Sequence, residues 1–99
     1  MNLVKRFPGS KIQFVEYENK MGEKIQDTEV RISCEVVLGV ENESETRLSV
    51  EVTKIEGENY QGVIRSFSNM PYLENLELGD SISFVDEHIF ICKSSKQGF

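Results

Sequence analysis

Hydrophobic residues occupy every second position along the stretch Glu29–Val40. The apolar positions are the even-numbered ones: Val30, Ile32, Cys34, Val36, Leu38 and Val40. Because successive side chains of a β-strand leave on opposite faces, this spacing predicts one half-buried strand over the whole stretch. Gly39 indicates a bend or bulge near its far end.

The same period of two returns in the segment Arg47–Ile55. Its predicted inner face consists of Leu48, Val50 and Val52, and Ile55 breaks the phase, which predicts a bulge or strand end at positions 53–54. The charged run 41–45 predicts a loop, so the two segments form a hairpin. A turn at 56–59 leads into a further strand, Tyr60–Phe67, within which Gly62 indicates a bulge or a close approach of another backbone.

Shorter alternating segments predict three more strands: Ile12–Tyr17, Ser81–Val85 and His88–Cys92. Turns are predicted at Asn19–Gly22, Gly79-Asp80 and Asp86-Glu87. Residues 23–28 fit either a short strand or a polar loop. The segment 68–78 is irregular, since Pro71 forbids a central strand, and a short helical turn is expected at 70–77.

These elements predict a mostly β fold in one domain covering residues 1–99. We expect six to seven antiparallel strands in a strongly bent sheet or a partly open small barrel, with at most a short helical turn. Residues 1–10 and 93–99 are expected to be a flexible lead and tail. The apolar content of 38% suits strands that each keep one wet face.

The net charge of the chain argues against some classes of binding partner. The net charge is −6, which argues against nucleic acid, because phosphate binding depends on lysine and arginine. Glu41–Glu58 and Glu74–Glu87 are acidic, and each is either a solvated surface or a docking surface for a basic partner. No stretch reaches the roughly 20 apolar residues of a membrane span, so we expect no membrane partner and a cytoplasmic protein.

The residues capable of catalysis or metal binding are few. Cys34, Cys92 and the single histidine, His88, supply too few donors for a metal site, and we expect no cofactor. No phosphate loop, dinucleotide-binding motif or G-x-S-x-G motif is present, so no catalytic residue is assigned and the chain is not expected to be an enzyme. Candidate binding residues are Met70, Tyr72, Asp80 and His88. Turn chemistry and an edge-strand position are the simpler explanations for the last two.

The segment Thr46–Ile91 carries a family resemblance. The residues concerned are Val50-Glu51-Val52-Thr53, Ile55, Gly57, Gly62-Val63-Ile64, Leu78-Gly79-Asp80, Ile82, Phe84 and Ile89. Their order is similar to the pattern V-x-V-x-x-I-x-G…G-x-L followed by G-D-x-V-x-F-x-x-x-x-I. About half of the chain thus resembles the YegJ-like family of small bacterial domains of unknown function, a family that brings no assigned activity.

Together these patterns lead to two functional hypotheses. The first is a non-catalytic binding or interaction module, of the accessory or inhibitor kind, whose acidic surface docks a protein partner. A weakly associated homodimer is also expected, because long alternating strands leave an edge that must be paired or protected. The alternative is a small-ligand binder or enzyme that uses the barrel mouth around Ser68–Gly79 and His88.

Overall fold

The part of the chain that the structure describes folds into eight strands and one turn of 3-10 helix. The computed structural model describes residues 2–41, 43–68 and 77–94. The elements are β1 (Gln13–Phe14), β2 (Tyr17–Glu18), β3 (Lys24–Ile25), β4 (Glu35–Val40), β5 (Glu43–Glu56), β6 (Asn59–Ser68), β7 (Ser81–Val85), η1 (Asp86–His88) and β8 (Ile89–Lys93). The expected mostly β class is confirmed. The helical turn expected at 70–77 falls on positions 69–76, which lie outside the described residues.

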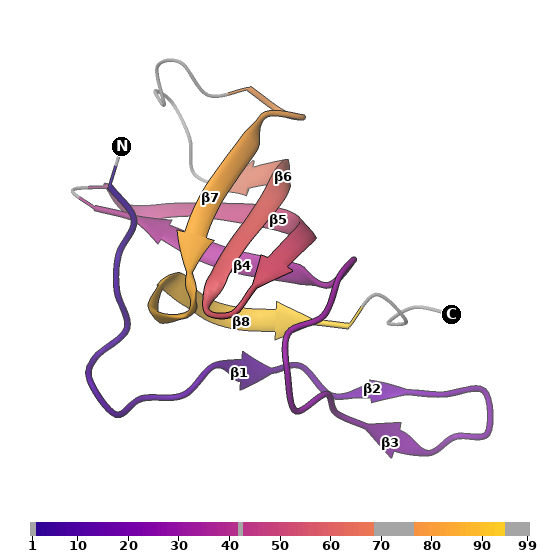
Figure 1. Ribbon diagram of the computed structural model, residues 1–99. Helices are drawn as coiled ribbons and strands as arrows, with labels where there is room; N and C mark the ends of the chain where they lie inside the picture. Colours follow the sequence, from indigo (N-terminus) through magenta and orange to yellow (C-terminus); the bar gives the residue numbers. More distant parts are fainter. Residues whose placement is uncertain (1, 42, 69–76, 95–99) are drawn as a thin grey trace.

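Six strands form one bent sheet that does not close into a barrel, in the order β1-β8-β4-β5-β6-β7 (Figure 1). The remaining two, β2 and β3, form a small hairpin. All pairs are antiparallel except β1 and β8, which run parallel. The sequence analysis expected only antiparallel pairs. Since β1 and β8 come from opposite ends of the chain, no hairpin turn dictates their relative direction.

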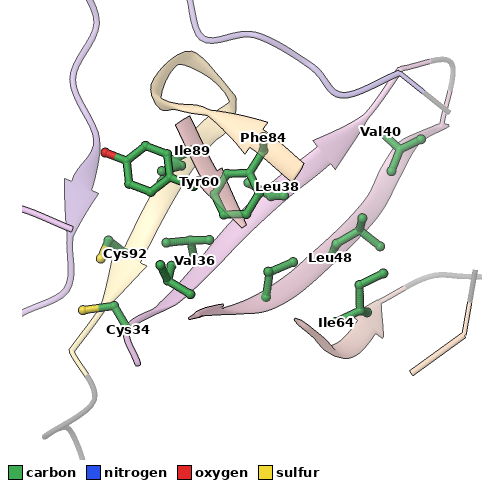
Figure 2. Close-up of a cluster of buried hydrophobic side chains, with 12 residues drawn as sticks. Cys34, Val36, Leu38, Val40, Leu48, Tyr60, Ile64, Phe84, Ile89 and Cys92 are labelled. Carbon is green, nitrogen blue, oxygen red and sulfur yellow. The ribbon is translucent and has the colours of Figure 1, made fainter. Parts of the chain in front are cut away.

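The core fills the concave side of this sheet (Figure 2). The buried apolar residues are Cys34, Val36, Leu38, Val40, Leu48, Val50, Val52, Tyr60, Ile64, Phe84, Ile89 and Cys92. Both predicted inner faces are therefore confirmed from Cys34 to Val52. The Tyr60 and Phe84 rings stack with centroids 5.5 Å apart, which joins β6 to β7 from the inside.

The strand predicted over Glu29–Val40 is wrong in its first half. β4 begins at Glu35, and Ile32 is 51% exposed. The chain turns before that point, because Ser33 has φ 73° and the Cys34 N–H donates to the Arg31 carbonyl at 3.1 Å. Alternating residues on the two sides of a turn look continuous in the sequence, so the pattern does not reveal the interruption.

The irregularities expected in the strands are confirmed. The register between β4 and β5 shifts at Gly39/Val40, and that between β5 and β6 shifts between Val52 and Lys54. Gly62 lies against another backbone: a Cβ built there would contact the Val50 side chain and lie 2.6 Å from the Glu51 carbonyl oxygen. Only glycine therefore fits at this position, because any larger side chain would overlap these atoms.

The lead, expected to be flexible, is hydrogen-bonded along the sheet. Val4 N–H donates to the Gly39 carbonyl at 3.0 Å, and Arg6 N–H donates to the Glu87 carbonyl at 2.8 Å. At the other end, β8 extends to Lys93, and positions 95–99 lie outside the described residues. In the part of the chain that the structure describes, no helix has the length and apolar character needed to cross a membrane.

Replacement of Gly62 by alanine tests the close approach of β5 and β6. We expect Gly62→Ala to lower the free energy of unfolding by about 1–3 kcal/mol, because the new methyl group overlaps Val50 and the Glu51 carbonyl. Urea unfolding measures this change. Gly39→Ala is the matched control, since its Cβ would lie at an ordinary 3.5 Å from Val4, and it should cost clearly less. Equal losses in the two variants would contradict this explanation.

Candidate functional site

The two candidate binding residues that the structure describes, Asp80 and His88, do not lie in one site. Met70 and Tyr72 lie outside the described residues. Asp80 precedes β7 and His88 follows it, so the five residues of that strand separate them. Five residues of strand span roughly 17 Å. Asp80 and His88 therefore lie at opposite ends of β7.

Asp80 stabilises the turn that leads into β7. Its carboxylate accepts a hydrogen bond from the Glu77 N–H at 2.9 Å, and its own N–H donates to the Glu77 carbonyl at 3.1 Å. Between them Gly79 adopts φ +91°, which favours glycine. This is the turn chemistry expected from the sequence.

His88 caps the opposite end of β7. The Val85 N–H donates to Nδ1 of the His88 ring at 3.1 Å, which requires that nitrogen to be unprotonated. Burial lowers the pKa of His88 below its ordinary 6.5, and the positive charge of Lys5 lowers it further, while the carboxylates of Glu87 and Glu41 act in the opposite direction. The ring is therefore neutral near pH 7.

On one side of β7, backbone groups pair with no strand among the described residues. Ile64 N–H donates to the Asp80 carbonyl at 2.9 Å, and Asp86 N–H donates to the Glu58 carbonyl at 3.2 Å. Hydrogen bonds to one neighbouring strand recur at every second residue, so the even-numbered residues face β6 and the odd-numbered ones face outward. We call the outward backbone of Ser81, Ser83 and Val85 the β7 edge. β7 ends the strand order, and no described strand covers this edge (Figure 1).

Carboxylates flank the β7 edge at both ends. Glu77 and Asp80 lie at its start, and Glu58, Asp86 and Glu87 lie at its end, a set that we call the acidic rim. Three cations lie near the second group: Arg6 pairs with Asp86 at 3.2 Å, Lys5 is close enough to influence His88, and Lys54 pairs with Glu56 at 2.9 Å. Because Lys54 and Glu56 balance each other, the five carboxylates of the rim outnumber the two remaining cations.

A hollow of about 380 Å³ adjoins the β7 edge. Gln61 lies opposite Ser83 and Asn59 opposite Val85, so these side chains line the outer face of β6 and β7 together. His88, Lys54 and Glu56 add polar groups to the lining, and Tyr60 and Phe84 add aromatic rings. The hollow is open and its lining is mixed, and Asp80 takes no part in it. It has the size to receive side chains from a segment lying along β7.

A second cleft, of about 910 Å³, opens beside η1. Its main polar feature is Arg6, whose guanidinium donates to the backbone carbonyls of Asp86 and Ile89. Tyr60 Oη donates to Asp86 Oδ1 at 3.5 Å, and burial together with the Asp86 charge raises the pKa of this tyrosine. These contacts fix the η1 turn and keep the Tyr60 proton in place, so the cluster is a structural clamp.

The cysteines are unsuited to nucleophilic chemistry. Cys34 and Cys92 are buried side by side where β4 and β8 meet (Figure 2), and both are free thiols. Burial raises the pKa of Cys92 to about 12, with a smaller contribution from the neighbouring Cys34. The reactive thiolate form is thus negligible near neutral pH. Among the described residues, no group of three or more histidine, cysteine, aspartate or glutamate side chains could hold a metal ion.

Comparison of the chain with protein-family models, curated proteins and solved structures found no match. The candidate site therefore depends on geometry alone: the β7 edge, the acidic rim and the hollow beside them. The sequence analysis singled out Asp80 and His88, which mark the two ends of this site. It missed Ser81, Ser83 and Val85 between them, because the free side of a strand is set by which other strand lies next to it.

The His88 cap predicts a pH-dependent contribution to stability. Because the folded-state pKa is lowered, the unfolded chain binds more protons below about pH 6.5, and stability falls as the pH decreases toward the folded pKa. His88→Ala removes this pH-dependent contribution to the free energy of unfolding. The difference in unfolding free energy between wild type and His88→Ala should be largest above pH 6.5 and shrink below it, as measured by urea unfolding from pH 5 to 8. A pH-independent difference would contradict a neutral, hydrogen-bonded ring.

Proposed function

We propose that this chain is a non-catalytic interaction module of the accessory or inhibitor kind, which binds a basic segment of a partner protein at the acidic rim. The single observation that carries the proposal is the position of the five carboxylates at the two ends of a strand edge that no described strand covers. Opposite charges at a rim increase the rate of encounter and select against acidic partners. The net charge of −6 supports the same class of partner.

Several features favour binding over catalysis. The nitrogen of His88 that faces β7 already accepts the Val85 N–H, and Asp80 is engaged in its own turn. The Cys92 thiol stays protonated. General acid–base or nucleophilic catalysis needs such groups free and close to one another. We therefore propose a module without cofactor and without enzymatic activity.

The two cysteine thiols support a proposal about the cellular compartment, and the resemblance noted in the sequence supports one about the family. Two buried, adjacent free cysteines suit a reducing compartment, so we place the protein in the cytoplasm. Membership of the YegJ-like bacterial family is likewise a proposal. Its support is that Gly62, Gly79 and Asp80, which contribute to the resemblance, occupy positions of close approach or tight turning.

Self-association is the second candidate, favoured by the free β7 edge. A two-fold axis through Ser83 would pair β7 with its copy in antiparallel fashion. In that register Ser81 lies opposite Val85, and Asp80 lies opposite the partner's Asp86. Like charges directly opposite each other destabilise a strand pair, so such a dimer is weak.

Binding of heptalysine tests the acidic rim. We expect an affinity that falls steeply between 50 and 300 mM salt, measured by fluorescence anisotropy of a labelled peptide. The double variant Glu58→Gln/Glu87→Gln should weaken binding about three- to tenfold, because it removes two exposed charges from the rim. Glu18→Gln/Glu23→Gln makes the same change of charge on the β2–β3 hairpin and should alter binding less than about twofold. Equal effects would show that only net charge matters.

The second candidate predicts a concentration-dependent dimer. Light scattering should show a monomer at low micromolar concentration and a growing dimer fraction toward millimolar concentration, with the dimer favoured by higher salt because salt screens Asp80 from the partner's Asp86. A monomer at all concentrations and salt levels would remove the self-association candidate.

A further inference from the structure

We infer that the partner's basic segment binds by adding to the sheet as an extra antiparallel strand beside β7. The inference deepens the proposed function and depends on it, because it states how the basic segment is held. Strand addition is a recurrent mode of peptide recognition, in which backbone hydrogen bonds supply affinity and side-chain positions supply specificity. The β7 edge is where this sheet can accept one.

The hydrogen-bonding groups of the β7 edge fix the register of the added strand. Ser81 and Ser83 each present an outward N–H and C=O, so each can exchange two hydrogen bonds with the residue opposite. At Val85 only the C=O is available, because its N–H is donated to His88. The added strand is therefore held by two complete pairs and stops at the His88 ring. The imidazole thereby fixes the position at which the added segment begins.

Side-chain positions along β7 define the sequence that fits. Ser81 and Ser83 are exposed on the outer face, where Ser83 lines the hollow, so small polar residues opposite them are suitable. Ile82 lies between them, half-buried against the core, so an apolar residue opposite Ile82 would extend the inner face. Beyond both ends the acidic rim favours lysine or arginine. The predicted ligand is a short extended segment with one central apolar residue, small polar neighbours and cations at each end.

The β7 edge carries little of the protection that exposed edges usually have. Its five residues contain no lysine and no proline, which are common blocking residues on such strands. The protection that it does have, the His88 cap and the flanking carboxylates, rejects acidic segments and lets basic ones approach. The acidic rim also opposes pairing with a second copy of this chain, so the edge is selective for a partner of opposite charge.

The test uses the peptide Lys-Lys-Thr-Val-Thr-Lys-Lys, acetylated and amidated, with heptalysine as its electrostatic control. We expect the threonine peptide to bind more tightly than heptalysine. Methylation of both threonine amide nitrogens should weaken it at least about tenfold, because those N–H groups point at Ser81 and Ser83. Methylation of the valine amide, which points away from β7, should leave the affinity within about twofold. Equal effects of the two methylations would overturn strand addition.

A pair of protein variants tests the same contact from the other side. Ser83→Pro removes the outward N–H without removing a bond to β6, a position at which an edge strand tolerates proline. Ser83→Ala removes only the hydroxyl. We expect the proline variant to weaken the threonine peptide at least about tenfold while heptalysine binding stays unchanged, and the alanine variant to bind normally.

Different results would contradict the basic-partner proposal and the strand-addition proposal. If heptalysine responds to the acidic rim but the threonine peptide is insensitive to Ser83→Pro and to threonine methylation, strand addition is wrong and the basic-partner proposal stands. If neither peptide binds at 50 mM salt, both are wrong. If wild type is a dimer that Ser83→Pro converts to a monomer, the edge belongs to a second copy of the chain. The methylated peptides decide the question even if the proline variant does not fold.

Discussion

The short connection between β7 and β8 constrains the whole sheet. Three strands, β6, β5 and β4, lie between them in the sheet order, which in a flat sheet would hold them about 19 Å apart. The three residues of η1 span only about 6 Å as a 3-10 turn. The sheet must therefore bend until the end of β7 reaches the start of β8. Arg6 holds that turn from outside, and the stacked Tyr60 and Phe84 rings support it from inside. Figure 1 shows β7 at a steep angle to β8, and the two strands do not pair, so no described strand covers the β7 edge.

Much of the fold was predictable, because apolar residues recur at every second position of a strand that is buried on one face. That signal located β6, β7 and β8 to within one residue at each end, and the interruptions at Gly39 and Gly62 corresponded to a register shift and a close approach. It located the end of β5 but not its start, because β5 begins at Glu43, within the charged run that was predicted to be a loop. The errors arose where two structures give the same pattern. The turn at Ser33 preserves the alternation across it, so the strand was extended too far. The parallel pairing of β1 with β8 joins residues almost eighty positions apart, and no local pattern encodes it.

The candidate site was predictable only at its ends. Asp80 and His88 attract attention because turns and titratable groups are visible in a sequence, and both do border the β7 edge. The edge itself is defined by a missing neighbour, which is a property of the assembled sheet. Ser81 and Ser83 are ordinary residues of an alternating strand, and only the bend of the sheet leaves their outward backbone without a neighbouring strand among the described residues. Recognition through a main chain leaves almost no compositional trace, in contrast to metal or phosphate sites.

The two borders of the six-stranded sheet are unequal, and this limits how copies of the molecule can assemble. β1 pairs with β8 at one border through only two positions and the Val15 N–H, which donates to the Cys92 carbonyl at 3.0 Å, whereas no described strand pairs with β7 at the other. Because β1, the edge strand at its border, is only two residues long, extended edge-to-edge contact can join β7 only to another β7, which closes after two molecules. Displacement of β1 would uncover a second, different border and permit head-to-tail addition, which does not close and generates fibres. The pairing of the short strand β1 with β8 thus limits edge-to-edge assembly to two molecules, and its loss would permit a polymer.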